Sequence, residues 1–226
     1  MLKLISSMAT RQVLAELAAA WRKSSGVEVT IESVGGVDAA KRVQAGEAFD
    51  GVVLASDAIE KLIASGQAVA GSRTDLVRSS VAIAVKAGAF KPEISTEAAL
   101  RSAIEAAPTI GYSTGPSGTA LVKLFEKWGI LEAIKPRIVQ APPGVPVGTL
   151  VARGEVALGF QQLSELMHLD GIDLLGTMPE AVAITTIFSA ATCAASTQGD
   201  AASRLFAFMA SSDAASLKTK HGMTAA

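Results

Sequence analysis

The sequence predicts an α/β protein with two lobes and an interdomain ligand cleft. Two observations carry this prediction. Short apolar runs alternate with segments of helical periodicity, and the runs are continuous, as in buried parallel strands. Two longer apolar stretches, 76–88 and 181–195, interrupt the alternation. We therefore expect two sets of elements that share two long crossover strands, near residues 76–85 and 181–192.

The first set of elements lies at the N-terminus. Segment 10–26 has helical periodicity and ends at Gly26, a residue that often closes a helix. The apolar run 51-GVVLA-55 reads as a buried strand. The predicted elements are strand 3–6, helix 10–26, strand 27–34, helix 37–46, strand 51–55 and helix 57–66.

The second set follows the first long strand and precedes a C-terminal helix predicted over 200–222. Its elements are helix 95–107, strand 109–113, helix 118–129, strand 136–141, helix 147–155 and strand 157–162. In helix 118–129 we expect Ser117 or Thr119 to be the N-cap. The predicted lobes are residues 1–80 plus 186–226, and the inserted residues 81–185.

The amino-acid composition argues against several classes of function. Half of the 226 residues are hydrophobic, the net charge is −1 and no basic cluster stands out, so we expect no nucleic-acid partner. A single cysteine, Cys193, reads as a core residue, and no His/Cys/Asp/Glu cluster has the spacing of a metal site. We expect neither a metal nor another cofactor, and no segment is apolar enough for membrane insertion.

Localisation is predicted from the first residues. Met1, Leu2 and Lys3 lead directly into an apolar strand, without a basic region or a cleavage site. The chain as written is therefore expected to be cytoplasmic, or periplasmic if a signal peptide was removed. An ABC permease is an expected partner only if the native protein is exported.

Three turns that lead from a predicted strand into a predicted helix are rich in serine and glycine. Ser6 and Ser7 end the first strand, Gly35 and Gly36 end the second, and the run 113-STGPSG-118 follows a later one. Ligands of open α/β sheets bind beyond the carboxyl ends of strands, where helix N-termini present free N–H groups. Hydroxyl and N–H donors in such turns predict a site for a small anion. A well-capped helix that binds nothing is the competing interpretation of each turn.

Three segments resemble bacterial molybdate-type periplasmic binding proteins, which have the type 2 periplasmic-binding fold. They are 4-LISSMATRQVLAELAAAW-21, 39-AAKRVQAGEAFDGVVLASDAIEKLIASGQAV-69 and 219-TKHGMTAA-226. The resemblance covers nearly the whole chain. It implies that a ligand is contacted by Ser6 or Ser7, Gly35, Gly36, Val37, Ser117, the segment Gly144–Val147 and Gln162.

Two departures from that family disfavour molybdate. The second turn reads 35-GGVD-38 where molybdate binders place a hydroxyl, and 159-GFQQLSEL-166 lacks their tyrosine. Each hydrogen bond that a buried oxyanion loses costs about 1–3 kcal/mol. The segment 158-LGFQQLSEL-166 resembles the branch that includes aconitate isomerase, which implies a di- or tricarboxylate ligand and interconversion of cis- and trans-aconitate. The alternative is the substrate-binding protein of an ABC transporter for molybdate, tungstate or another small anion.

An isomerase of that kind needs a group that takes a proton from one carbon and returns it at another, and donors for the enolate that develops. Asp38 is the candidate base, with a relay through Ser7 as an alternative; a solvated first-turn carboxylate is the competing reading of Asp38. Arg11 is a candidate for binding a substrate carboxylate or is a surface residue. Gln161 and Gln162 point to opposite sides of a strand, so we expect only one of them to bind ligand and the other to satisfy backbone groups.

Overall fold

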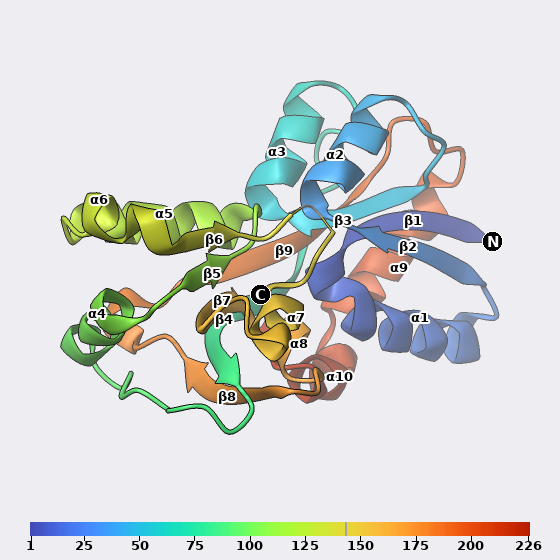
Figure 1. Cartoon of the computed structure of the whole chain (residues 1–226). Helices are drawn as coiled ribbons and strands as arrows, with labels where there is room; N and C mark the ends of the chain where they lie inside the picture. The colour runs from blue at the N-terminus through green and yellow to red at the C-terminus, as the bar shows by residue number, and fades with distance from the viewer. Residues whose placement is uncertain (143) are drawn as a thin grey trace. The chain divides into compact units, whose positions relative to one another are not determined.

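The structure is a computed structural model that describes residues 1–142 and 144–226. The chain divides into two compact units, Met1–Ser79 with Thr186–Ala226, and Ser80–Thr185. The α/β prediction is confirmed in both units (Figure 1). No helix within the described ranges is long and apolar enough to cross a membrane.

The first unit is built on a mixed sheet with three parallel strands. Strand β1 (Leu2–Ser7) pairs in parallel with β2 (Val29–Val34) and β3 (Gly51–Ala55), and β3 pairs antiparallel with β9 (Thr185–Thr192). The first half of β4 (Thr74–Lys86) pairs antiparallel with β10 (Met223–Ala225). Its helices are η1 (Met8–Thr10), α1 (Arg11–Ser25), α2 (Gly36–Gln44), α3 (Ser56–Ala64), α9 (Gly199–Ala210), η4 (Ser212–Ala214) and α10 (Ala215–Lys220).

Helices cover both faces of this sheet. On one face, Leu4 and Val53 pack with side chains of α1 and α9; on the other, Ile5 and Val52 pack with side chains of α2 and α3 (Figure 1). Neighbouring residues of β1 and of β3 therefore enter different cores. This is the physical reason why these strands read as continuous apolar runs.

The second unit has its own sheet. Strand β5 (Ile110–Tyr112) is parallel to β6 (Ile138–Gln140) and β7 (Leu158–Gln162), while the second half of β4 is antiparallel to β7 and β8 (Ile172–Thr177). One core joins β5 and β7 to α4 and α5, and a smaller one surrounds α7. The helices are α4 (Glu97–Ala106), α5 (Pro116–Lys127), α6 (Leu131–Ile134), η2 (Lys135–Arg137), α7 (Val147–Arg153), α8 (Leu163–Leu166) and η3 (Glu180–Val182).

The C-terminal helix differs from the prediction. Instead of one helix over 200–222, α9 ends at Ala210 and α10 begins at Ala215. Ser211 leaves the helical conformation, with ψ 163°, and its hydroxyl donates to the carbonyl of Phe208. Strand β10 then follows where helix or tail was expected. Strand β8 was also absent from the prediction, because its half-buried sequence IDLLGT has no strong strand signal.

Helix α5 also begins earlier than the predicted helix over 118–129. Pro116 is its first residue and Gly115 its N-cap, so neither Ser117 nor Thr119 caps the helix. Proline suits the first helical position because its missing N–H is not needed there. A Cβ atom at Gly118 would lie 1.9 Å from the carbonyl oxygen of Ser113, so only glycine fits this close approach.

Candidate functional site

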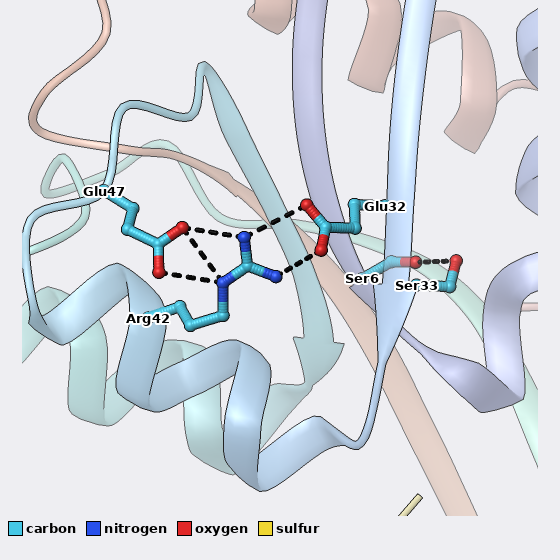
Figure 2. Close-up of polar contacts among 5 residues, drawn as sticks. All are labelled: Ser6, Glu32, Ser33, Arg42 and Glu47. Atoms are coloured by element: carbon cyan, nitrogen blue, oxygen red, sulfur yellow. Dashed lines mark hydrogen bonds and ion pairs between the residues drawn. The ribbon is translucent and has the colours of Figure 1, made fainter.

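The carboxyl ends of β1 and β2 bring the first two predicted turns together. The strands run in register, with Ser6 opposite Ser33 and Ser7 opposite Val34. Ser6 is completely buried, and its Oγ lies 2.8 Å from the Oγ of Ser33 in a hydrogen bond (Figure 2). Ser6 therefore supports the end of the sheet in addition to any contact that it makes with a ligand.

Ser7 lies against the start of α2. Its Oγ accepts a hydrogen bond from the N–H of Ala9 at 3.3 Å, and its carbonyl accepts one from the hydroxyl of Thr10 at 3.0 Å. A Cβ atom built at Gly36 would be 3.8 Å from the Oγ of Ser7. The serine turn and the glycine turn are thus neighbours, as the sequence predicts.

The first turn of α2 offers uncapped N–H groups. Gly35 is its N-cap and has no side chain to satisfy them. The side chain of Val37 is 48% exposed, and Asp38 is half-buried, with no hydrogen bond or ion pair within residues 1–142 and 144–226. Free N–H groups at the positive end of a nine-residue helix favour an anion.

An ion-pair cluster fastens α2 to β2 (Figure 2). Arg42 of α2 binds the carboxylate of Glu32 in a two-pronged contact and also donates to Glu47, with Nε 2.8 Å from Oε1 of Glu47. The hydrogen bonds from Arg42 lower the pKa of both carboxyl groups, and the two carboxylates raise the pKa of Arg42. This cluster fixes the helix whose first turn borders Ser7.

The family-like fragment QAGEAFDGVVLAS has a structural role at its aspartate. Asp50 is buried and accepts hydrogen bonds from the N–H of Lys3 (2.9 Å), the hydroxyl of Ser196 (2.7 Å) and the amide of Gln198 (3.1 Å). It ties β1 to the segment before α9. Asp50 is therefore a structural acceptor with its oxygens already occupied.

Arg11 has no contact that links it to the serine and glycine turns within the described residues. It is the first residue of α1 and is exposed, and it makes no hydrogen bond or ion pair in the described ranges. Its role in binding a carboxylate stays a prediction.

The second unit also gathers its predicted residues at one sheet edge. Tyr112, the last residue of β5, lies opposite Gln140 of β6 and Phe160 of β7. The carbonyl of Tyr112 accepts a hydrogen bond from the N–H of Ala141 at 2.9 Å. Because the three strands are parallel, the segments that follow them leave the sheet at the same edge. The segments after β5 and β6 carry Ser117 and Gly144, and Gln161 and Gln162 are the last two residues of β7.

Ser117 and Gly144 differ in exposure. Ser117 is the second residue of α5, is 7% exposed and makes no hydrogen bond through its hydroxyl within the described residues. Gly144 is exposed and has φ +77°, a left-handed conformation that favours glycine.

The two neighbouring glutamines are both buried, but Gln161 has a clear internal role. Its Oε1 accepts the N–H of Gly148 at 3.1 Å, and its Nε2 donates to Oε1 of Glu165 at 2.9 Å. Gln161 is thus the glutamine that satisfies a backbone group. The alternation of strand side chains turns Gln162 the other way, so Gln162 is the better candidate for contact with a ligand.

Glu165 is the residue that the sequence reasoning missed. Its carboxyl group lies in α8, at the end of β7, and burial raises its pKa to about 7 although the hydrogen bond from Gln161 acts in the opposite direction. The available signal was a carboxyl-bearing residue three positions after the end of a buried strand, in 159-GFQQLSEL-166.

The two histidines and the single cysteine lie outside the predicted site residues. His168 is exposed beyond α8. His221 is buried after α10, and its Nε2 lies 3.4 Å from Oε1 of Glu16. Cys193 is buried in the core beside α2 and α3, and burial raises the pKa of its thiol to about 12.

Comparison with known proteins identifies the family of the chain. A curated relative from Pseudomonas sp., aconitate isomerase, is 38% identical over 222 residues, which is 95% of this chain and 84% of the relative. The periplasmic molybdate-binding protein of Azotobacter vinelandii has a structure that matches with a TM-score of 0.80 at 21% identity, over 99% of each chain.

A tungstate-binding protein of Desulfovibrio alaskensis matches with a TM-score of 0.67 at 18% identity, over 95% of this chain and 92% of the other. At these identities the two structures establish the fold, which is that of periplasmic binding proteins. The family model described as bacterial extracellular solute-binding protein matches residues 2–224. The chain therefore belongs to the bacterial extracellular solute-binding protein family.

Proposed function

We propose that this protein is an isomerase of the aconitate isomerase type, which interconverts cis- and trans-aconitate by moving a proton between two carbons. The observation that carries the proposal is the 38% identity to aconitate isomerase across 95% of the chain. We also propose a periplasmic location in place of the cytoplasmic one expected from the first residues, because the chain belongs to an extracellular family.

The substrate is a small tricarboxylate, and the donors of both units suit it. In the first unit we assign binding to Ser6, Ser7 and the first turn of α2 with Gly35, Gly36 and Val37. Free N–H groups and hydroxyls hold carboxylates and also stabilise the negative charge that develops when a neighbouring C–H bond ionises.

In the second unit we assign binding to Ser117, Gly144 and Gln162, with Gln161 as a supporting residue that orients its neighbours. Arg11 is assigned to a substrate carboxylate, because a guanidinium group matches a carboxylate with two parallel hydrogen bonds. Since Arg11 has no partner in the described ranges, its charge is available for this role.

The proton is removed from the methylene carbon of aconitate by Asp38, or by a relay through Ser7. Asp38 suits this task because it is half-buried and holds no other partner in the residues that the structure describes. Replacing it by asparagine removes the base but keeps its shape. We expect Asp38→Asn to lower turnover by about 10²–10⁴ and to leave aconitate binding nearly unchanged.

The hydrogen-bond donors of both units also suit a second function, anion binding for an ABC transporter. A substrate-binding protein of an ABC transporter needs only donors for its anion, and the molybdate- and tungstate-binding proteins share this fold. Thermal unfolding with molybdate, tungstate, sulfate, citrate and both aconitates separates the ligands. A ligand at ~100 times its dissociation constant adds ~2.7 kcal/mol of stability. Stabilisation by molybdate alone would argue for transport.

The decisive experiment follows the chemistry. Purified protein is incubated with cis-aconitate in D₂O, and the vinyl and methylene protons are followed by NMR. We expect the trans isomer to accumulate with deuterium at carbon. Binding of aconitate without either change would assign the chain to the transport function.

A further inference from the structure

We propose that Arg42 is a positioning residue of this isomerase. Its guanidinium group, held between Glu32 and Glu47, sets the place of the first turn of α2 (Figure 2). That turn carries the proposed base and the N–H groups assigned to a substrate carboxylate, so the inference rests on the proposed function. All of these residues lie in the first unit.

The first turn of α2 has few side chains that hold it in place. Its N-cap, Gly35, and its first residue, Gly36, have no side chains, and the side chain of Val37 is 48% exposed. The buried apolar residues of α2 are Ala39 and Val43, which are both small. Because apolar packing is non-directional, the place of the first turn depends on directional contacts made elsewhere on the helix.

Arg42 supplies directional contacts to two other segments. Its guanidinium group binds Glu32 of β2 in a two-pronged contact, with Nη2 3.0 Å from Oε2. Nε and Nη2 also donate to Glu47, in the segment before β3, at 2.8 and 2.7 Å. The group lies over the ring of the buried Phe49, 5.3 Å from the ring centre. Two-pronged pairing and stacking fix the plane of a guanidinium group, which a point charge such as an ammonium group cannot reproduce.

The contact with β2 lies on the sheet face from which Ser7 projects. Glu32 is in register with Ile5 of β1, and Ser7 follows Ile5 by two residues, so these side chains share one face. The core on that face contains Ile5 and residues of α2. Through Glu32, Arg42 therefore ties α2 to the strand ends beside Ser7. The first turn of α2 lies close to that serine, since a Cβ atom at Gly36 would be 3.8 Å from its Oγ.

The length of the helix makes a small tilt matter. Arg42 lies six residues after Gly36, which is about 9 Å along a helix axis at about 1.5 Å per residue. A tilt of about 6° around Arg42 would therefore move the first turn by about 1 Å. A misplacement of about 1 Å can lower a rate by about 10². Exposed ion pairs contribute little to stability, so loss of the two-pronged contact should lower activity far more than the melting temperature.

The test compares two lysine variants of the full chain. Arg42→Lys keeps the positive charge between the two carboxylates but loses the planar group, so we expect kcat/KM for cis-aconitate to fall about 10–100-fold. Arg73→Lys is the matched control. Arg73 also joins two carboxylates of the first unit, Asp75 through two bonds and Glu60 through one, and its side chain is 31% exposed, against 30% for Arg42. These partners lie in β4 and α3, so the control should keep the activity of the unchanged protein.

A second measurement reports the position of the turn in the absence of substrate. The amide NMR signals of Gly35, Gly36 and Val37 should move in Arg42→Lys and stay in place in Arg73→Lys. The melting temperature should fall by a similar small amount in both variants, because each loses the same kind of exposed ion pair. A purely structural role of Arg42 would lower the melting temperature and leave both these amide signals and kcat/KM unchanged.

Three results overturn the inference. They are a kcat/KM of Arg42→Lys within about threefold of the unchanged protein, an equal fall in Arg73→Lys, and a fall in activity without movement of the amide signals. If the unchanged protein binds aconitate without isomerising it, the dissociation constant replaces kcat/KM in the same comparison. Absence of both binding and isomerisation overturns the proposed function itself, whereas the amide signals still decide whether Arg42 holds the first turn of α2.

Discussion

The buried carboxyl group of Glu165 makes a prediction about stability that is independent of catalysis. Its pKa rises from 4.5 to about 7 on folding, because burial disfavours the charged form. The folded state therefore binds more protons than the unfolded state between these two values. It follows that the contribution of Glu165 to stability is greatest below the unfolded pKa and is lost as pH rises through the folded pKa.

The magnitude follows from the shift. At about 1.4 kcal/mol for each pKa unit, a group fully ionised in both states at pH 8 destabilises the fold by at most about 3 kcal/mol. Water that reaches the half-buried side chain reduces this value. We expect Glu165→Gln, which keeps the hydrogen-bonding partner of Gln161, to raise the free energy of unfolding at pH 8 by about 1–3 kcal/mol. At pH 4 the variant and the unchanged protein should differ little.

The assay is urea unfolding of both proteins at pH 4, 6 and 8, followed by circular dichroism. Glu180→Gln, an exposed change in the same unit, is the control and should show no gain with pH. An equal effect of Glu165→Gln at pH 4 and pH 8 would refute the reasoning, since it would mean that the ionised carboxylate is not penalised by its surroundings.

Three further predictions concern packing and buried polar groups, each checked by urea unfolding. Gly118→Ala should destabilise the fold by about 1–3 kcal/mol or more, because its Cβ would lie 1.9 Å from a backbone carbonyl oxygen. Gly36→Ala is the control and should be tolerated, because its Cβ would have no atom nearer than 3.8 Å. Equal losses of stability in the two variants would contradict this prediction. Asp50→Asn should cost about 1–3 kcal/mol, since an amide nitrogen replaces an acceptor, and Ser196→Ala should cost less. Lys218→Met should stabilise by about 1–3 kcal/mol at neutral pH, because its buried Nζ has no hydrogen-bond partner in the described ranges; a loss would refute this.

The buried strands were the most predictable part of the fold. Strand β3 lies between two cores and is apolar throughout. A short continuous apolar run was therefore enough to predict it as a buried strand. The end of the C-terminal helix was less predictable. Ser211 stops α9 through a local hydrogen bond to Phe208, and serine is also common within helices that continue. Periodicity alone does not separate these cases.

The candidate site was predictable where backbone topology places it. Ser7 and Gly36 lie at the ends of adjacent parallel strands, so their proximity follows from the strand–helix alternation. The sequence did not show which of Gln161 and Gln162 has the structural role. That role depends on which side chain accepts the N–H of Gly148, a contact between residues 13 positions apart. Glu165 was not predicted, because its raised pKa comes from burial and the burial of an ionisable residue is not visible in a sequence.

The same donors serve binding and catalysis in this fold, and the difference between the two functions is small. Hydroxyls and helix N–H groups that hold a carboxylate also stabilise the enolate that forms when the neighbouring carbon loses a proton. A binding protein therefore already supplies the electrostatic part of an isomerase. What it lacks is a group that exchanges a proton with carbon. On the proposed assignment Asp38 is that group: it lies in the first turn of α2, is half-buried and has no hydrogen bond or ion pair within the described residues, so its carboxyl group is free to meet a substrate.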